Sequence, residues 1–268
     1  MTELYHKAAV ILNLKIFMYN SIMFYFDKIN GKKILKSDLL EDVRHFFTTR
    51  ETVIKSNEKD YQMIVAQNKK DICEYLNITA DDFISPSQTH SANIRETQIG
   101  QTDYPETDGL ILTNQKQGIF LNFADCVPVI LYDRINNIAA ILHAGWRGTA
   151  QRIAALTVEK MINEYNSHAE NILAVIGPAI SKCCYNVGFD VTEKLSAAVS
   201  DKSDLFDERG GEIFADLKEI NRRQLTETGI KKIDVCPYCT VCDNDMFFSY
   251  RKENAASSRH SAVICLKK

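Results

Sequence analysis

Three short apolar segments follow one another in the middle of the chain, at Ile119–Phe123, Val127–Tyr132 and Ile138–Leu142. Each is rich in Ile, Val, Leu or aromatic residues and is bounded by turn residues. Runs of this length and composition are typical of strands that are buried on both faces. Apolar positions at helical spacing follow them, which predicts an amphipathic helix over Thr149–Tyr165.

Strand and helix patterns alternate along the rest of the chain. Asn30-Gly31 between two apolar runs is a strong hairpin signal. We predict helices at Asp60–Asn77, Val191–Val199 and Leu217–Thr228, and strands at Ala9–Tyr19, Ile22–Ile29, Lys32–Leu35, His45–Arg50, Gly109–Thr113, Ile172–Ile176, Ile233–Val235, Met246–Tyr250 and Ser261–Leu266. The expected fold is α/β, with a mixed central sheet flanked by helices. No repeat or low-complexity linker divides the chain, so residues 1–268 are expected to form a single domain.

Composition narrows the functional classes. The chain has 25% charged residues and a formal net charge of −3, which gives no electrostatic case for nucleic-acid binding. Lys15 interrupts the apolar N-terminal stretch, and no window approaches the roughly 20 uncharged apolar residues of a membrane span. We expect a cytoplasmic protein without membrane contact, whose eight cysteines are thiols or metal ligands rather than disulfides. The oligomeric state stays open.

Three possible metal ligands lie at or near the ends of the predicted core strands. They are His90, Cys126 and His143, and a catalytic zinc site usually has three such ligands and an open fourth position. Their separations of 36 and 17 residues do not identify a site. The alternative is that Cys126 is a small buried apolar residue and His143 a hydrogen-bonded core histidine.

The segment Gly145-Trp146-Arg147-Gly148 joins the last apolar run to the predicted helix. Glycines allow close backbone approach, and free amides at a helix start attract anions, so this turn is a candidate phosphate site with Arg147 as its charge. A tight turn with a solvated Arg147 is the alternative. Arg251, Lys252 and Arg259 are similarly either contacts for an anionic substrate or parts of a solvated face.

Cys236, Cys239 and Cys242 have the spacing of a structural zinc or iron–sulfur site. A tetrahedral site needs a fourth ligand, for which Asp243, Cys265, Cys183 and Cys184 are candidates. Three separate thiols remain the alternative interpretation.

Several motifs resemble those of the YfiH-type family, whose members have been called multicopper polyphenol oxidoreductases, laccase-domain proteins or purine nucleoside phosphorylases. The resemblance runs from about His45 to the C-terminus, and residues 1–40 show no clear match. It is carried by TDGLILT (Thr107–Thr113), ADCVPVILYD (Ala124–Asp133), HAGWRGT (His143–Thr149), IGPAISKCCYNVG (Ile176–Gly188), DLKEINRRQL (Asp216–Leu225) and FFSYRKE (Phe247–Glu253). The sequence departs from the family after Arg50, where Glu51–Ile54 replaces a glycine pair and a serine, and at Asn186, which replaces a carboxylate.

The resemblance implies a single-domain α/β fold and zinc bound by His90, Cys126 and His143. It also implies phosphorolysis of adenosine, inosine, guanosine and methylthioadenosine, with deamination of adenosine. We expect Arg50, Gln88, Arg147 and Arg251 to bind the nucleoside or phosphate. Ser91-Ala92 follows His90, so the His-x-Glu motif of other zinc deaminases is absent, and Asp125 becomes the candidate acid/base beside Arg147.

Two other functions compete with this one. Two histidines and a cysteine resemble a blue-copper ligand set, so a copper phenol oxidase is the second hypothesis. A multicopper oxidase also needs a cluster held largely by imidazoles, and the chain has only six histidines. The third hypothesis is a non-enzymatic protein that zinc stabilises.

Overall fold

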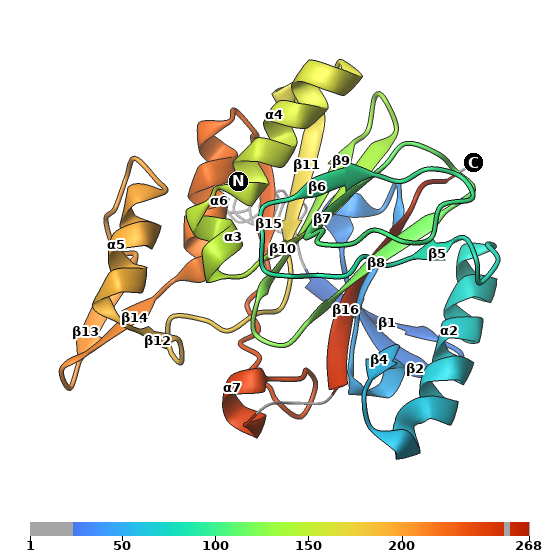
Figure 1. The fold of residues 1–268 in the computed structure, drawn as a ribbon, viewed down its shortest axis with the longest axis horizontal. Coiled ribbons are helices and arrows are strands. Elements are labelled where there is room, and N and C mark those ends of the chain that lie inside the picture. The colour runs from blue at the N-terminus through green and yellow to red at the C-terminus, as the bar shows by residue number, and fades with distance from the viewer. Residues whose placement is uncertain (1–23, 255–257, 268) are drawn as a thin grey trace, which may run out of the picture.

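Two large β-sheets form the centre of the protein, whose computed structural model describes residues 24–254 and 258–267 (Figure 1). The first sheet has the order β1-β2-β3-β16-β8-β5, with β4 also paired to β16. Its strands are antiparallel apart from the β5–β8 pair. They span Phe24–Ile29 (β1), Lys32–Ser37 (β2), Arg44–Thr48 (β3), Lys55–Ser56 (β4), Phe83–Ile84 (β5), Gly118–Phe123 (β8) and Ser258–Cys265 (β16).

The second sheet has the order β15-β11-β9-β10-β7-β6, and its two outer pairs are parallel. Its strands span Ile94–Glu96 (β6), Gly109–Leu112 (β7), Val127–Asp133 (β9), Ile138–Ala144 (β10), Ile172–Ile176 (β11) and Lys232–Val235 (β15). A small third sheet contains Asn186–Val187 (β12), Phe206–Arg209 (β13) and Glu212–Ala215 (β14), and lies with α5 (Phe189–Ala197) at the periphery in Figure 1.

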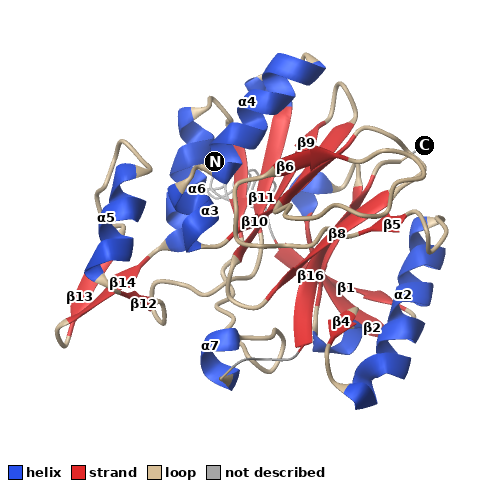
Figure 2. Cartoon of the chain, viewed as in Figure 1, coloured by secondary structure: helices blue, strands red, loops and turns tan. Residues whose placement is uncertain are grey.

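The two large sheets face each other, and helices cover their outer faces (Figure 2). Alternate residues of β9 explain this layering, because successive side chains of a strand point to opposite faces. Ile130 packs in the core between the sheets, whereas Val129 and Leu131 pack in the core beneath α4 (Ile153–Tyr165) and α6 (Leu217–Glu227). On the other side, α2 (Gln62–Leu76) covers the first sheet.

The α/β class is confirmed, with the strands divided between two sheets where one central sheet was expected. The hairpin at Asn30-Gly31 is also confirmed, and both residues have positive φ, at 48° and 80°. The predicted strand over Ala9–Tyr19 lies outside the described residues. Among the helices that the structure does describe, none has the length and hydropathy needed to cross a bilayer.

Two predicted elements are wrong. The helix expected over Thr149–Tyr165 is two helices, α3 (Trp146–Ala150) and α4, because Arg152 between them adopts the left-handed conformation with a φ of 63°. The strand expected over Met246–Tyr250 is a turn leading into α7 (Tyr250–Glu253). Its consecutive residues Phe247 and Phe248 are both buried, so the alternation of a half-exposed strand is missing.

Candidate metal centre and its pocket

Two segments that pass from one sheet to the other and the end of one strand bring three side chains together. Cys126 lies in the loop that joins β8 of the first sheet to β9 of the second, and His90 lies in the connection from β5 to β6. His143 is near the end of β10. The ligand atoms of these three residues lie within 4.8 Å of one another, and we call them the His–Cys–His centre.

Asp108, which was not predicted from the sequence, contacts both His143 and the backbone segment that contains His90. Its buried carboxylate accepts a hydrogen bond from Nδ1 of His143 at 2.8 Å. It also accepts the backbone N–H groups of Thr89, His90 and Ser91 at 3.1, 3.0 and 2.7 Å. Because Nδ1 of His143 is engaged, Nε2 is the atom left for a ligand, as in carboxylate–histidine–metal arrangements. In the sequence, Asp108 is marked only by its place in the TDGLILT motif, which does not indicate a role for this residue.

The electrostatics favour an ionised thiol. Burial alone would raise the pKa of Cys126, but the charges and hydrogen bonds of His143 and His90 outweigh it and lower the pKa to about 6. Burial would likewise lower the pKa of His143, but Cys126 and Asp108 raise it to about 9. Burial opposes the ionised form of Asp108 too, yet hydrogen bonds from His143 and Ser91 leave its pKa well below the usual range. A half-buried thiolate and a buried carboxylate beside two imidazoles suit a divalent cation.

The glycines of the HAGWRG segment are needed for close packing against the centre. A Cβ atom at Gly145 would lie 2.9 Å from Sγ of Cys126 and 3.2 Å from Cδ2 of His90. A Cβ atom at Gly148 would lie 3.0 Å from the carbonyl oxygen of Ser91. These glycines, expected to form a turn that lets the backbone approach a ligand, also make room for the side chains and backbone of the centre.

A pocket of about 870 Å³ opens beside the centre. Gln88, Asp125 and Arg251 line it, as do the three possible ligands. Arg259, one of the candidate contacts for an anionic substrate, also lines the pocket. The wall is completed by residues that had no predicted role, namely Lys55, Lys69, Phe120, Tyr185 and Tyr250. The size falls within the usual range for small-molecule sites.

The lining residues that sequence analysis named also have structural contacts. The side-chain amide of Gln88 pairs with both backbone groups of Asn122 in β8, at 2.9 Å each. The carboxylate of Asp125 accepts hydrogen bonds from Oγ1 of Thr240 at 2.6 Å and from the backbone N–H of Arg251 at 2.7 Å. The guanidinium of Arg251 donates to Asn186, the residue that departs from the family motif.

Arg50 and Arg147 are not among the residues that line the pocket. Arg50 donates to the carbonyl of Asn244 at 2.6 Å, pairs with Glu253 and lies over the ring of Phe248. Arg147 is exposed and lies 4.3 Å from the ring centre of Trp146. The helix expected to begin at Thr149 begins at Trp146 and has only five residues, so the predicted start is wrong, and phosphate binding at this turn stays a prediction.

The fold and the centre together define an α/β protein with a possible His–Cys–His metal-ligand set at the wall of a polar pocket. Residues 45–267 match the family described as multi-copper polyphenol oxidoreductase laccase, and the chain belongs to this family. It is 29% identical over 233 residues to purine nucleoside phosphorylase YlmD of Bacillus subtilis (strain 168), covering 82% of this chain and 83% of that protein.

Two further comparisons agree with this assignment. The chain is 30% identical over 243 residues to adenosine deaminase RL5 from an unknown prokaryotic organism, covering 82% of this chain and 92% of the relative. The crystal structure of the hypothetical protein YfiH from Bacillus licheniformis superposes with a TM-score of 0.83 at 32% identity, covering 90% of this chain and 99% of that one. The resemblance to the YfiH-type family is confirmed, and the protein is an enzyme of this family.

Proposed function

We propose that the protein is a zinc-dependent purine nucleoside phosphorylase that accepts adenosine, inosine, guanosine and methylthioadenosine and also deaminates adenosine. The observation that carries the proposal is the His–Cys–His centre on the wall of a cationic pocket. The names of the relatives, a purine nucleoside phosphorylase and an adenosine deaminase, support both activities. All eight cysteines are free thiols, which fits a reducing compartment such as the cytoplasm.

The residues of the centre suit zinc. They offer one thiolate and two imidazoles, with an orienting carboxylate behind His143, and such three-ligand sets keep a position open in catalytic zinc sites. A zinc ion held there would supply Lewis acidity, the chemistry by which zinc enzymes activate water or polarise a substrate.

The phosphate is expected at the cationic wall. Phosphorolysis joins a phosphate oxygen to C1′ of the ribose as the purine leaves, so the anion must be held against the sugar. Lys55, Lys69, Arg251 and Arg259 line the pocket, and Asp125 is the one carboxylate among the lining residues that the structure describes. Burial lowers the pKa of Lys69 and the charge of Lys55 lowers it further, so a bound anion would relieve the repulsion between the two lysines.

Asp125 is the proposed acid/base because of its place in that wall. Each of its carboxylate oxygens accepts one hydrogen bond and keeps a lone pair that can take a proton. In deamination it would carry a proton between the attacking water and the leaving amino group. The rings of Phe120, Tyr185 and Tyr250 offer surfaces on which a purine can stack.

Arg50 and Arg147 act, in this proposal, from outside the pocket lining. Arg50 would fix the segment that contains Asn244 and Glu253. The charge of Arg147 acts on Tyr185 of the lining, together with that of Arg251, and opposes the rise in the pKa of Tyr185 that burial causes. Arg147 therefore remains a substrate-binding candidate at the pocket edge, secondary to the four lining cations.

A phosphate titration of two reactions tests the proposal. The variant Lys69→Met removes the charge with little change in shape, and Lys70→Met, whose side chain is 70% exposed on the same helix, is the control. Losing one charge-assisted contact of about 1.5–3 kcal/mol should raise the phosphate requirement of phosphorolysis about 10- to 150-fold. Adenosine deamination uses no phosphate and should change much less. Equal losses in both reactions would place Lys69 outside a phosphate site, and absence of both reactions from the wild-type enzyme would refute the proposed function.

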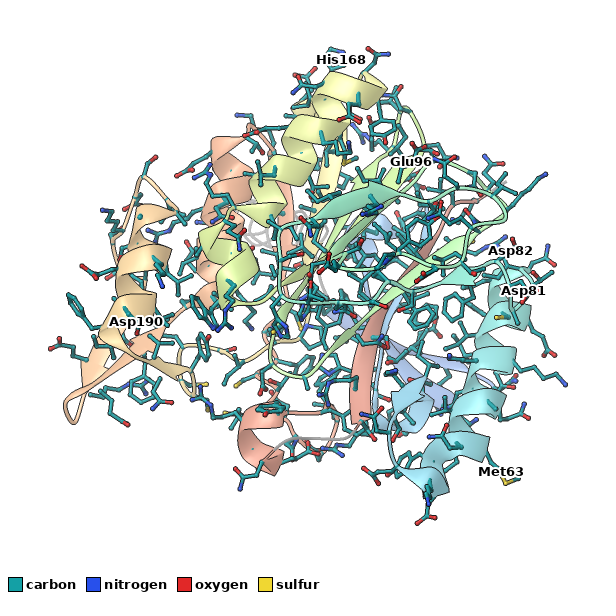
Figure 3. The ribbon with its side chains drawn as sticks, in the orientation of Figure 1. Met63, Asp81, Asp82, Glu96, His168 and Asp190 are labelled. Carbon is teal, nitrogen blue, oxygen red and sulfur yellow. The ribbon has the colours of Figure 1, made fainter. Side chains whose placement is uncertain are left out.

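The copper alternative finds little support in the remaining histidines that the structure describes. His45 and His260 are buried at other contacts, with Ser37 and Pro178 respectively, and His168 lies beyond the end of α4 (Figure 3). Within residues 24–254 and 258–267, neither group of three or more possible ligands contains a further imidazole. Phenol oxidation that exceeds nucleoside turnover, in protein with stoichiometric copper, would reverse this preference.

A further inference from the structure

A second group of possible ligands lies apart from the His–Cys–His centre. The sulfur atoms of Cys183, Cys184, Cys239 and Cys242 lie within 4.8 Å of one another, and we call this group the thiol cluster. Cys242 is 3.5 Å from Cys184 and 3.7 Å from Cys183, measured between sulfur atoms. The membership differs from the spacing prediction, because Cys236 points into the core between the two large sheets.

We propose that the thiol cluster binds one structural zinc ion. With zinc–sulfur bonds of about 2.3 Å, a tetrahedral site separates its sulfur atoms by about 3.8 Å. The separations of Cys242 from Cys184 and Cys183, at 3.5 and 3.7 Å, are already close to this value, and no pair in the cluster exceeds 4.8 Å. Four thiolates in tetrahedral arrangement favour zinc or iron, and sulfur atoms this close enclose a single ion rather than a multi-iron cluster.

The backbone around the cluster is already arranged for a thiolate site. The Cys239–Cys242 turn is closed by a backbone hydrogen bond from Asp243 to the carbonyl of Cys239 at 2.7 Å, and the Asp243 side chain accepts the N–H of Cys239 at 2.8 Å. The backbone N–H of Ser181 donates to Sγ of Cys239 at 3.4 Å. A bridge between Ala179 and Cys239 holds the two turns together. Little reorganisation is therefore needed for all four sulfur atoms to contact one ion.

Cations beside the cluster offset its charge. A zinc ion with four thiolates has a formal charge of −2, which neighbouring positive groups stabilise. Arg209 donates to the carbonyl oxygens of Lys182 and Cys183, at 2.6 and 3.4 Å, and Lys252 donates to that of Val241 at 3.0 Å. Both cations thus bind the backbone of the segments that contribute the thiols.

The proposed ion would fix one wall of the pocket. Ile180 and Tyr185, which flank Cys183 and Cys184 in sequence, line the pocket. In the other segment, Thr240 donates to the carboxylate of Asp125. Zinc in the thiol cluster would tie these two segments together from behind, without contacting the substrate. This role goes beyond the proposed activity and does not depend on it.

Zinc counting on the full-length chain, purified under anaerobic and reducing conditions, tests the inference. The wild-type enzyme should contain two zinc ions per chain, and both Cys126→Ala and the double variant Cys183→Ser/Cys242→Ser should contain one. Cys183 and Cys242 are exposed, so serine at these positions leaves the core unchanged. The matched control is Cys236→Ala, which lies in the same cysteine-rich segment and should keep both ions. A zinc count that does not fall by one from the wild-type enzyme to the double variant, or from Cys126→Ala to the triple variant that combines all three substitutions, would overturn the proposal.

Cobalt substitution provides a second measurement that is independent of catalysis. In Cys126→Ala the His–Cys–His centre has no thiolate, so thiolate-to-cobalt charge-transfer absorption must come from the thiol cluster. We expect this absorption in Cys126→Ala and its loss when Cys183→Ser/Cys242→Ser is added. Its absence from Cys126→Ala, or a disulfide between the two turns in the reduced protein, would contradict the inference. Failure of nucleoside phosphorolysis would refute the proposed function and leave both metal measurements unchanged.

Discussion

The His–Cys–His centre and the thiol cluster are built in opposite ways. The centre stands at the ends of buried strands, where Asp108 and Gly145 fix its side chains through contacts distant in sequence. The thiol cluster stands on two surface turns, whose shape comes from local backbone hydrogen bonds. Three ligands leave a position for chemistry, whereas four ligands close a site. Under the two proposals, the comparison teaches that a reactive zinc site is held by contacts from the buried sheets, whereas a structural zinc site can be formed by two turns.

The variant Cys126→Ala should have the largest effect and tests whether the His–Cys–His centre is the reactive site. Removing the thiolate from the centre should lower nucleoside turnover more than about 100-fold, which exceeds the usual cost of losing an outer partner of a metal ligand. The fold should persist, because the side chain contributes little to the core. Activity and zinc content would be compared with Cys73→Ala, a buried thiol on α2. Full zinc occupancy of the centre in Cys126→Ala would contradict the ligand assignment.

Asp108→Asn tests whether the carboxylate organises the centre. The neutral amide cannot match the charge that Asp108 presents to His143, so zinc affinity at the centre should fall about 10- to 100-fold. Competition with a chelator measures this change, and added zinc should restore activity. The control is Asp133→Asn, an equally buried carboxylate at the far end of β9. Similar zinc affinity in both variants would mean that Asp108 only shapes the backbone.

Gly145→Ala tests the packing argument with a single methyl group. The added carbon would displace Sγ of Cys126 and weaken zinc binding at the centre by about 10-fold, or about 1.4 kcal/mol. Gly188→Ala is the matched control, because both glycines precede a helix with extended backbone and φ values of −68° and −74°. At Gly188 the new carbon would meet only Oδ1 of Asp190, the end of a flexible side chain. Equal zinc affinities in the two variants would argue against the contact.

The smallest effect on either metal site is expected from substituting His45. Its pKa changes when the chain folds, so it affects the stability of the fold. Burial lowers the pKa of His45 to about 4, although the carbonyl of Val43 opposes this change. The unfolded chain therefore binds a proton below about pH 6.5 while the folded chain does not, so stability falls as the pH drops from about 6.5 to 4. The loss is at most about 3 kcal/mol.

Denaturation across this pH range in His45→Gln, with exposed His168→Gln as control, checks the sign. The glutamine amide can still accept the hydrogen bond from Ser37, and the acid-induced loss should be smaller than in the wild-type enzyme. An unchanged acid profile would assign the destabilisation to other groups, and a changed zinc content at neutral pH would contradict the separation of fold and centre.

Hydrophobic patterns within short segments predicted most of the individual strands and helices. Unbroken apolar runs identified β8, β9 and β10, and apolar spacing identified α2, α5 and α6 within a few residues. The break at Arg152 was missed because no residue there is a helix breaker. The division into two sheets was missed because strands buried on both faces look alike in sequence, whichever layer covers them.

The features of the two candidate metal sites that could not be predicted depend on contacts between residues distant in sequence. The family resemblance predicted that His90, Cys126 and His143 lie together, but it said nothing of Asp108 behind His143. The cysteine spacing suggested a metal site and offered Cys183 and Cys184 among several partners for Cys242, from which they are separated by 59 and 58 residues. Only the fold shows that these two join the cluster while Cys236 does not.

The place of β16 in the first sheet carries a kinetic consequence. This strand pairs with β3 on one side and β8 on the other, and its Ser261 donates to Thr48 across a separation of 213 residues. Until residues 258–265 have been synthesised, β3 and β8 present unpaired edges, which are templates for association with other chains. Closing so long a loop is slow on the scale of folding reactions. Substitutions that delay the docking of β16 should therefore reduce the yield of folded enzyme more than they reduce the stability of the molecules that complete folding.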